Sequence, residues 1–431
     1  MIRVAVIGGG PAGLCAARYL GAKPDVFKFV VYEQTDDIGG AWVYTDEVGT
    51  NKYGQPVQSS MYSNLRTNLP KQVMMFPDLP IDEGGKTSFI THFEVLQYLK
   101  RYATTSNVYD KLKLLTRVES VKPVTSDNKT SWEVIVKSLD NPDAAPQVNQ
   151  FDAVMVCNGH YAVPRFPDIP GVDSFTGKLL HSHDYRHPED FNGKTLLMLG
   201  AGNSGRDIAM NLCPNVKKIY LSHLHPAIEC PLPDNLIQVP DIKHVEEETV
   251  VFTDGRSVKA DVIMLCTGYE YTFPFLKPEC EVEVDRNRVT PLYRHIIHTQ
   301  FPSLSFIGIP WKVCPFPQIS CQVRFAMAAL DGTMKLPSQT EMNADIQKDY
   351  DQRRNKWKMP HRYAHMMGGL QWDYNKELLQ LAGVDDDIPP AIIKLYEKVS
   401  QVRSADLMNY KKHNFELTNN MEDWRSIESA M

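Results

Sequence analysis

The chain has 431 residues, of which 43% are hydrophobic and 23% are charged. This composition is typical of a globular protein with a sizeable core, and it excludes disordered, collagen-like and coiled-coil chains. The 46 basic and 52 acidic residues give a net charge of −6, so no basic excess indicates binding to nucleic acid or to an anionic membrane. At about 150 residues per domain, the length predicts two or three domains.

The cysteines and the apolar runs exclude several further classes. None of the eight cysteines forms a C-x-x-C pair, which disfavours zinc ribbons and redox dithiols, and their number fits a reducing compartment. No run approaches 18 uncharged apolar residues, and the N-terminus shows no secretory signal. We therefore expect a cytoplasmic protein with no membrane span, no metal site and no nucleic-acid partner.

The chain opens with the pattern of a parallel α/β sheet. Residues 2–7 predict a buried strand, Gly8-Gly-Gly-Pro-Ala-Gly13 predicts a glycine-rich turn, and residues 14–20 predict a helix. In such G-x-G-x-x-G units the first glycine permits a tight turn, the second lets the backbone approach a pyrophosphate, and the third packs helix against strand. A second strand over residues 27–32 ends at Glu33, which is placed to bind a ribose hydroxyl.

The remaining elements include a second unit of the same kind. A capping box at Thr91 predicts a helix to about residue 104, and strands follow over 132–136 and 151–157. After a proline-rich connector at 164–171, the second unit has a strand (195–199), the loop Gly200-x-Gly202-x-x-Gly205, a helix to about residue 212 and a strand (218–222). The later predictions are a hairpin at 254–255, strands over 261–266 and 304–307, and helices over 318–331 and 338–357.

Two dinucleotide loops in one chain indicate two different dinucleotides, and the usual pair is FAD with a nicotinamide cofactor. Disulfide reductases share this arrangement, but they need a paired dithiol that the cysteine spacings do not supply. The pattern therefore predicts a flavin and pyridine-nucleotide oxidoreductase.

One motif between the loops narrows the class. Residues Phe175-Thr-Gly-Lys-Leu-Leu-His181-Ser-His-Asp-Tyr185 have the form F-x-G-x-x-x-H-x-x-x-Y, which is far more specific than a glycine loop. The motif resembles the signature of the class B flavin-dependent monooxygenases, in the flavin-containing monooxygenase branch. Residues 38–42, 151–160 and 202–209 also resemble that branch, and residues 59–71 look most like its short arthropod and microbial members. Tyr185 at the end of the motif, in place of tryptophan, disfavours the Baeyer–Villiger relatives.

The resemblance implies an α/β fold with two Rossmann-like dinucleotide-binding domains. The NADP-binding domain, residues 166–284, is expected to be inserted in a discontinuous FAD-binding domain, residues 1–165 and 285–431. The implied cofactors are FAD and NADPH, and the implied chemistry is oxygen transfer from a flavin 4a-hydroperoxide to a nucleophilic nitrogen or sulfur. Asn68 matches the family's active-site asparagine, whose amide holds the oxygenated flavin and the nicotinamide ribose. His181 is expected to be a structural residue between the domains.

The resemblance also assigns residues to the two cofactors. The expected FAD site consists of Gly8, Gly10, Pro11, Ala12, Gly13, Glu33, Ala41, Trp42 and Leu69. The expected NADP site consists of Thr67, Asn68, Ser204, Gly205, Arg206 and Asp207. One departure concerns specificity, because residues 220–225 (Tyr-Leu-Ser-His-Leu-His) lack the arginine that the family commonly places there for the NADP 2′-phosphate. Either Arg206 substitutes for it, or the preference for NADPH is weaker.

The expected substrates are dioxygen and a small amine or thioether. The arthropod resemblance suggests N-oxygenation of tertiary amines such as plant alkaloids, a xenobiotic detoxification. Two alternatives stay open: an NADPH oxidase that releases hydrogen peroxide, and a non-catalytic redox sensor that binds both dinucleotides. Whether the chain forms a homo-oligomer is also left open.

Overall fold

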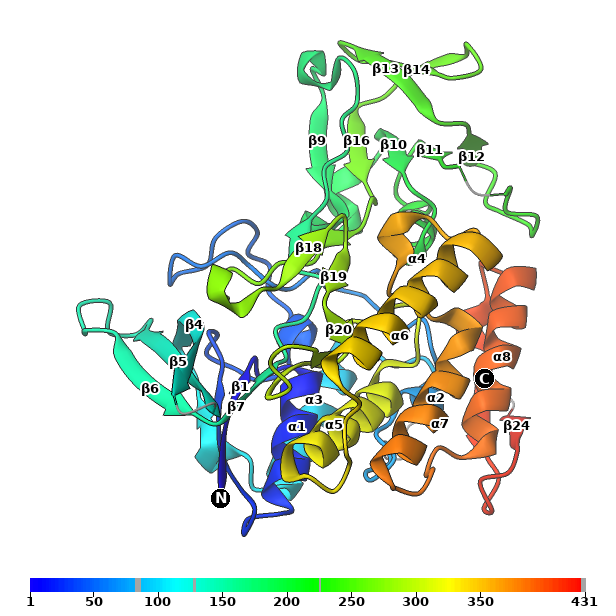
Figure 1. Cartoon of the computed structure of the whole chain (residues 1–431). Helices are drawn as coiled ribbons and strands as arrows, with labels where there is room; N and C mark the ends of the chain where they lie inside the picture. The colour runs from blue at the N-terminus through cyan, green and yellow to red at the C-terminus, as the bar shows by residue number, and fades with distance from the viewer. Residues whose placement is uncertain (82–86, 127–128, 225, 428–431) are drawn as a thin grey trace.

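The structure, a computed structural model, describes residues 1–81, 87–126, 129–224 and 226–427. Two α/β units are stacked on one another, and the C-terminal helices α6, α7 and α8 lie beside the first unit and below the second (Figure 1). Each unit contains a largely or wholly parallel sheet, which confirms the predicted α/β class with two Rossmann-like units.

The first unit is built on a seven-stranded sheet in the order β20-β21-β22-β7-β1-β2-β3. Strands β22, β7, β1, β2 and β3 run parallel. At one edge, β21 pairs antiparallel with β22, and β20 pairs antiparallel with β21. The bounds are β1 (Ile2–Ile7), β2 (Phe27–Tyr32), β3 (Leu112–Lys113), β7 (Ala153–Val156), β20 (Leu292–Tyr293), β21 (Ile297–His298) and β22 (Leu304–Phe306).

Both faces of this sheet are covered, as the uninterrupted apolar run of β1 requires. Val4 and Val6 pack in the core formed by helices α1 (Pro11–Gly21), α3 (His92–Thr105) and α5 (Pro315–Asp331). Ala5 and Ile7 face the other way, onto an antiparallel sheet of β4 (Thr116–Ser126), β5 (Lys129–Ser138) and β6 (Gln147–Phe151). Successive strand residues point to opposite faces, so a single strand anchors two layers.

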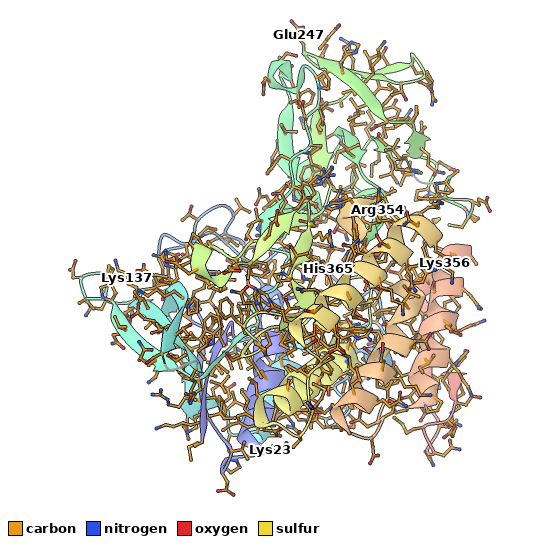
Figure 2. All side chains as sticks on the ribbon, viewed as in Figure 1. Lys23, Lys137, Glu247, Arg354, Lys356 and His365 are labelled. Atoms are coloured by element: carbon orange, nitrogen blue, oxygen red, sulfur yellow. The ribbon has the colours of Figure 1, made fainter. Side chains whose placement is uncertain are left out.

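The second unit repeats this plan with a five-stranded parallel sheet in the order β12-β11-β10-β16-β9. Its strands are β9 (Lys178–His181), β10 (Thr195–Leu199), β11 (Lys218–Ser222), β12 (Leu236–Val239) and β16 (Val262–Leu265). Helix α4 (Asn203–Leu212) packs on one face. Strands β13 (Ile242–Glu246), β14 (Thr249–Phe252) and β15 (Ser257–Lys259) cover the other face, with Glu247 at the tip of their hairpin (Figure 2).

The chain passes between the units at two points that lie side by side. Strand β8 (Val163–Pro164) enters and strand β17 (Tyr269–Glu270) returns, and the two pair antiparallel. Directly after β17, Tyr271 and Phe275 already pack in the core beneath β4 and β5 of the first unit. The predicted limits of the NADP-binding domain, residues 166 and 284, stay a prediction.

The C-terminal half adds elements that the sequence predicted only in part. Helix α5 begins three residues before the predicted start, because Pro315 fits the first turn of a helix, where its missing N–H is not needed. Helix α6 continues into a π-helical turn, and a terminal hairpin, β23–β24, was not predicted. The bounds are α2 (Lys71–Met74), α6 (Gln339–Asp351), η7 (Gln352–Lys356), α7 (Gln371–Ala382), α8 (Pro390–Ala405), β18 (Glu283–Asp285), β19 (Arg288–Thr290), β23 (Asn414–Leu417) and β24 (Trp424–Ile427).

The predicted capping box at Thr91 is confirmed. The Thr91 hydroxyl accepts a hydrogen bond from the backbone N–H of Glu94, and the Glu94 carboxylate accepts the Thr91 N–H in return. Ser338 and Glu341 form the same reciprocal pair at the start of α6. In the described part of the chain, no helix combines the length and apolar character needed to cross a bilayer.

A buried arginine that the sequence did not single out fastens the entry of the second unit to the first. Arg186 is only 4% exposed, and its guanidinium donates hydrogen bonds to backbone carbonyls alone. The acceptors lie on segments that are distant in sequence: Thr45 (2.7 Å), Glu47 (3.1 Å), Ser59 (3.0 Å), His183 (2.7 Å) and Tyr185 (3.0 Å). One side chain therefore fixes the 45–59 loop against the segment that leads into α4.

Replacing Arg186 with methionine should strongly destabilise the fold. The substitution keeps most of the apolar stem but leaves the carbonyl groups without donors, and each unsatisfied buried group costs about 1–3 kcal/mol. We expect a loss of about 3 kcal/mol or more, seen as a lower midpoint of thermal unfolding. Arg425→Met is the control, because the Arg425 side chain is 71% exposed and pairs with Glu416 at the surface. Equal midpoints for the two variants would contradict the fastening role.

Candidate active site

The two glycine loops have nearly the same backbone geometry. Gly8 and Gly200 both have φ of +109°, and a Cβ added at either would lie 2.5 Å from the carbonyl oxygen of Cys157 or Cys266, respectively. At Gly13 and Gly205 an added Cβ would overlap the carbonyl oxygen of the first glycine of the same loop. Only glycine therefore lets each helix begin this close to the end of its strand, as the motif requires.

The helices that follow the loops begin without any side-chain cap. Gly10 is the N-cap of α1 and Gly202 that of α4, and no described side chain accepts a hydrogen bond from either first turn. Pro11 at the start of α1 has no N–H to satisfy. The free N–H groups and the helix dipole make both ends suitable for a phosphate group. At Gly202 no atom lies within 4 Å of an added Cβ, so this loop is open to a ligand.

Glu33 faces the first loop from the end of β2. Its carboxylate accepts the N–H of Gly9 (2.6 Å) on one oxygen, and the N–H (2.8 Å) and hydroxyl (2.9 Å) of Thr35 on the other. Burial raises the pKa of Glu33, and these hydrogen bonds oppose that shift. No cation pairs with it among the described residues, and a carboxylate has about four acceptor positions. One further donor, such as a ribose hydroxyl, fits this site.

A second glycine pair holds the 39–42 segment against the first loop. The Gly39 N–H donates to the Gly9 carbonyl (3.0 Å), and a Cβ added at Gly40, whose φ is +58°, would lie 3.1 Å from the Gly10 Cα. The short helix η1 (Gly40–Trp42) thereby places Ala41 and Trp42, both predicted FAD contacts, beside the loop. A side chain at Gly40 would therefore press on the backbone of the first loop, and one at Gly39 would lie 2.5 Å from the Leu96 side chain.

Asn68 projects from a segment that is fixed on both sides. Thr67 is held by the N–H and carbonyl of Ile90, since its N–H donates to Ile90 (2.8 Å) and its hydroxyl accepts from it (3.2 Å). The Lys71 N–H donates to the Ser88 carbonyl (2.7 Å). Among the described residues, nothing hydrogen-bonds to the half-buried Asn68 amide. Its donor and acceptor remain available, as an active-site amide requires, while the Thr67 hydroxyl is already engaged.

Asp207, a predicted NADP contact, is already engaged by protein groups. Tyr62 donates its hydroxyl hydrogen bond to one carboxylate oxygen, and Lys411 forms an ion pair with the other at 2.5 Å. The Lys411 ammonium also donates to the Arg66 carbonyl (2.9 Å). Asp207 thus ties α4 to the chain just before Asn68. No local pattern indicated Tyr62 or Lys411, because their contacts with Asp207 span 145 residues or more.

Ser204 and Arg206, also predicted for NADP, lie on the first two turns of α4. Ser204 is exposed, and Arg206 is half-buried with an Nε atom that is shielded from solvent and has no partner. Leu69, predicted for FAD, packs against the main core of the first unit. Ala12 and Gly13 are buried at the start of α1.

The residues of the F-x-G-x-x-x-H-x-x-x-Y motif support the second sheet rather than an open site. A Cβ at Gly177 would overlap the Asp261 carbonyl oxygen. His181 at the end of β9 is fully buried, and burial lowers its pKa to about 4. Tyr185 is also buried and donates to the Asn211 side chain (2.5 Å). These contacts fit the structural role expected for His181.

The end of β11, where an arginine for the 2′-phosphate was missing from the sequence, carries no cationic replacement among its described residues. Ser222 donates its hydroxyl hydrogen bond to the Pro240 carbonyl (2.8 Å), and His223 contacts the Gln238 side chain (3.1 Å). His225 lies outside the described residues.

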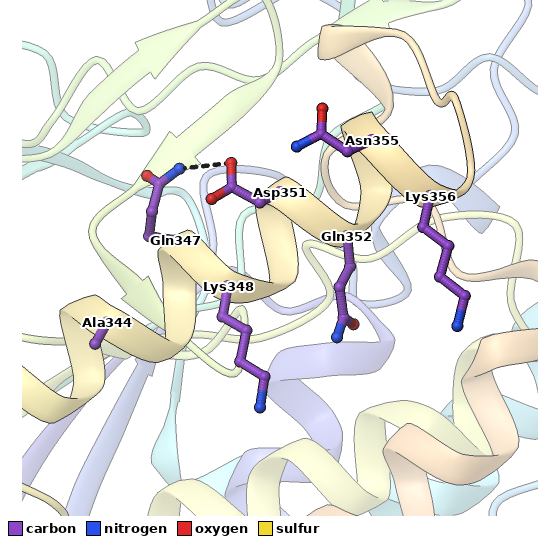
Figure 3. Close-up of a pocket in the computed structure, with 7 residues that line it drawn as sticks. All are labelled: Ala344, Gln347, Lys348, Asp351, Gln352, Asn355 and Lys356. Carbon is purple, nitrogen blue, oxygen red and sulfur yellow. Dashed lines mark hydrogen bonds between the residues drawn. The ribbon is translucent and has the colours of Figure 1, made fainter.

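The hollow of greatest volume described below does not lie at the two glycine loops. One hollow of about 640 Å³ runs along α6 and η7, and its lining residues all belong to that segment. Figure 3 shows Lys348, Gln352 and Lys356 pointing to one side of the helix and Gln347, Asp351 and Asn355 to the other. A binding pocket is concave and walled by more than one element, so this hollow is the solvated face of one helix. No group of three metal-ligating side chains is found in the described residues.

The comparisons with known proteins place the chain in a family. The family model described as flavin-binding monooxygenase-like matches residues 1–228 and 229–402. The chain belongs to this family. It is 37% identical over 401 residues to the flavin-containing monooxygenase FMO GS-OX-like 4 of Arabidopsis thaliana, covering 89% of this chain and 88% of that relative.

Two solved structures are similar over almost the whole chain. The S-allyl-L-cysteine S-oxygenase of Allium sativum has a TM-score of 0.87 and 37% identity, covering 96% of this chain and 95% of the other. Tmm from a Pelagibacter strain has a TM-score of 0.86 and 26% identity, covering 98% and 95%.

Family membership makes this chain a flavin monooxygenase that uses FAD and NADPH. The residues present fit both groups, because each glycine loop offers an uncapped helix N-terminus and the buried Glu33 carboxylate has room for one more donor. We propose the first loop, with Glu33 and residues 39–42, for FAD, and the second loop for NADPH.

Alanine substitutions at the third glycines should separate the two sites. In Gly13→Ala the new methyl group displaces α1 from β1, so we expect the purified chain to lack bound flavin. In Gly205→Ala we expect flavin to be retained and the Kd for NADPH to rise at least about tenfold, equivalent to about 1.4 kcal/mol. Flavin absorbance per chain and the NADPH dependence of flavin reduction measure the two effects.

The control for both variants is Gly369→Ala, because no atom lies within 4 Å of a Cβ at that position. Full flavin content in Gly13→Ala would refute the assignment of the first loop. Loss of flavin from Gly205→Ala, with Gly13→Ala unaffected, would show that the two assignments are reversed.

Proposed function

We propose that this monooxygenase transfers one oxygen atom from dioxygen to a nucleophilic sulfur or nitrogen of a small molecule, with NADPH as the reductant. One observation supports this proposal. Two uncapped helix N-termini that suit phosphate groups occur together with Asn68, whose amide has no hydrogen-bond partner among the described residues and lies on a segment that contacts both units. Small thioethers are the substrates we favour, since the S-allyl-L-cysteine S-oxygenase is 37% identical and similar over 96% of this chain.

Nitrogen oxygenation is the second candidate. The resemblance of residues 59–71 to short arthropod and microbial members favours tertiary amines such as alkaloids. A thioether sulfur and an unprotonated amine nitrogen each carry the lone pair that the reaction needs, so one site can serve both chemistries. The NADPH oxidase alternative uses the same cofactors but transfers no oxygen to a substrate.

Bound FAD and NADPH would supply the hydride transfer and the activation of dioxygen that the reaction needs. The contributions of the chain are binding, orientation and exclusion of water. The uncapped ends of α1 and α4 bind phosphates, and Glu33 accepts a ribose hydroxyl. The backbone contacts of Thr67 and Lys71 position the Asn68 amide to donate to an oxygen or accept from a ribose hydroxyl. The substrate supplies its own lone pair, so the reaction needs no acid–base pair from the chain.

Asn68→Ala should uncouple NADPH use from product formation. Without the amide donor, activated oxygen is lost as hydrogen peroxide, so we expect product per NADPH to fall at least about tenfold, as for loss of a polar contact in a water-excluded site. Flavin reduction by NADPH should change little. The matched control is Asn64→Ala, since Asn64 is exposed on the same loop and should leave coupling unchanged. Unchanged coupling in Asn68→Ala would remove the role proposed for this amide.

A substrate screen tests the proposed function directly. NADPH consumption, hydrogen peroxide and oxygenated product are measured together for small thioethers, tertiary alkyl amines and an alkaloid. For a substrate, we expect peroxide per NADPH to fall well below one while sulfoxide or N-oxide accumulates in proportion. A peroxide ratio near one with every compound would support the oxidase, and no steady turnover would support the sensor.

A further inference from the structure

Several cationic side chains gather where the C-terminal part of the chain meets the first turns of α4. They are Arg66, Arg206, Arg403 and Lys411, and the carboxylate that pairs among them is Asp207. Burial lowers the pKa of the Lys411 ammonium, and the neighbouring guanidinium groups of Arg403 and Arg66 lower it further. The positive charges are therefore close enough to repel one another.

Two of these arginines have no counter-ion among the residues that the structure describes. Arg403 lies near the end of α8 and donates from Nη1 to the Asn203 side chain (3.0 Å), the first residue of α4. Arg206 lies one turn further along α4, and its pKa is lowered by burial and by the charge of Arg403. The Nε atoms of both arginines are buried without a partner, and no carboxylate pairs with either within the described ranges.

This arrangement is unfavourable unless an anion joins it. Like charges brought together in a partly desolvated place cost free energy, and a buried N–H without an acceptor adds to that cost. The chain has six more acidic than basic residues, yet the carboxylate in this cluster, Asp207, is already taken by Lys411 and Tyr62. The space beside Gly202 is open, and Asn203 and Ser204 are exposed.

We propose that Arg403 and Arg206 together bind a phosphate group of the nicotinamide dinucleotide at the start of α4. A guanidinium pairs with phosphate through parallel charge-assisted hydrogen bonds, which explains two arginines in a place where no described carboxylate pairs with them. This inference rests on the proposed assignment of the second glycine loop to NADPH. It adds a residue from outside the Rossmann-like unit, 200 positions further along the chain than Asn203.

If the bound group is the 2′-phosphate, the proposal also accounts for the missing arginine at the end of β11. A cofactor held by Arg403 is bound by the C-terminal helix as well as by the second unit, as Figure 1 makes visible in the position of α8 below that unit. Phosphate recognition is thus supplied by a helix that folds with the first unit. The phosphate is either the pyrophosphate, which NADPH and NADH share, or the 2′-phosphate, which only NADPH has.

Calorimetric titration of the oxidised, flavin-loaded enzyme with NADP⁺ and with NAD⁺ tests this, because binding is measured without turnover. For Arg403→Gln we expect the Kd to rise about tenfold or more, and the dependence of affinity on NaCl concentration to become less steep. A rise for both dinucleotides identifies the pyrophosphate, and a rise for NADP⁺ alone identifies the 2′-phosphate. Both results support the proposal.

The control is Lys398→Gln, which removes one charge from the exposed face of the same helix and should change the Kd less than about twofold. Arg403→Lys keeps the charge but not the paired donors, and we expect an intermediate Kd; it also serves if Arg403→Gln does not fold. Wild-type affinity and salt dependence in both Arg403 variants would overturn the proposal. If Gly205→Ala also binds as tightly as wild type, the loop assignment fails instead.

Discussion

The structure depends on a close approach between a helix and the strand before it. This approach occurs at Gly13, between α1 and β1, and again at Gly205, between α4 and β10. A Cβ at either position would overlap the carbonyl oxygen of Gly8 or Gly200. Because the side chain is absent, the helix starts directly above the carboxyl end of the sheet and directs its free N–H groups to one place. The layers that cover the two sheets, helices on one face and three antiparallel strands on the other, follow the same plan in both units.

The space between the units is organised by the chain from residue 39 to 69. Gly39 bonds to the first loop, Ala41 accepts the Ser59 hydroxyl (2.9 Å), and Tyr62 donates to Asp207 on α4. Hydrogen bonds along this one segment therefore connect the first nucleotide loop to the helix that follows the second, and Asn68 lies a few residues further on. In a reaction that needs a reductant, a flavin and a substrate in one place, this segment sets how the two cofactor sites face each other.

The sequence predicted what depends on neighbouring residues. Strands β1, β2, β10 and β11 and the Thr91 capping box are specified by short apolar runs, glycines and a threonine–glutamate pair, so their bounds could be derived. Arg186 and Lys411 could not be found in this way, because their partners are backbone carbonyls or a carboxylate more than a hundred residues away. The predicted contact at Asp207 shows the same limit, since the motif gives the position of the carboxylate and not the lysine that engages it.

The pairing of β8 with β17 has a consequence for how such a protein is assembled. The strand that leaves the first unit and the strand that returns to it lie next to each other, with Pro164 opposite Tyr269. A segment whose two ends meet can be inserted, removed or replaced without stretching the host, since the host needs only to bridge a few ångströms. A second unit taken from another family member should therefore fit the same host, provided that its α4 presents one carboxylate that pairs with Lys411 and accepts the hydrogen bond of Tyr62.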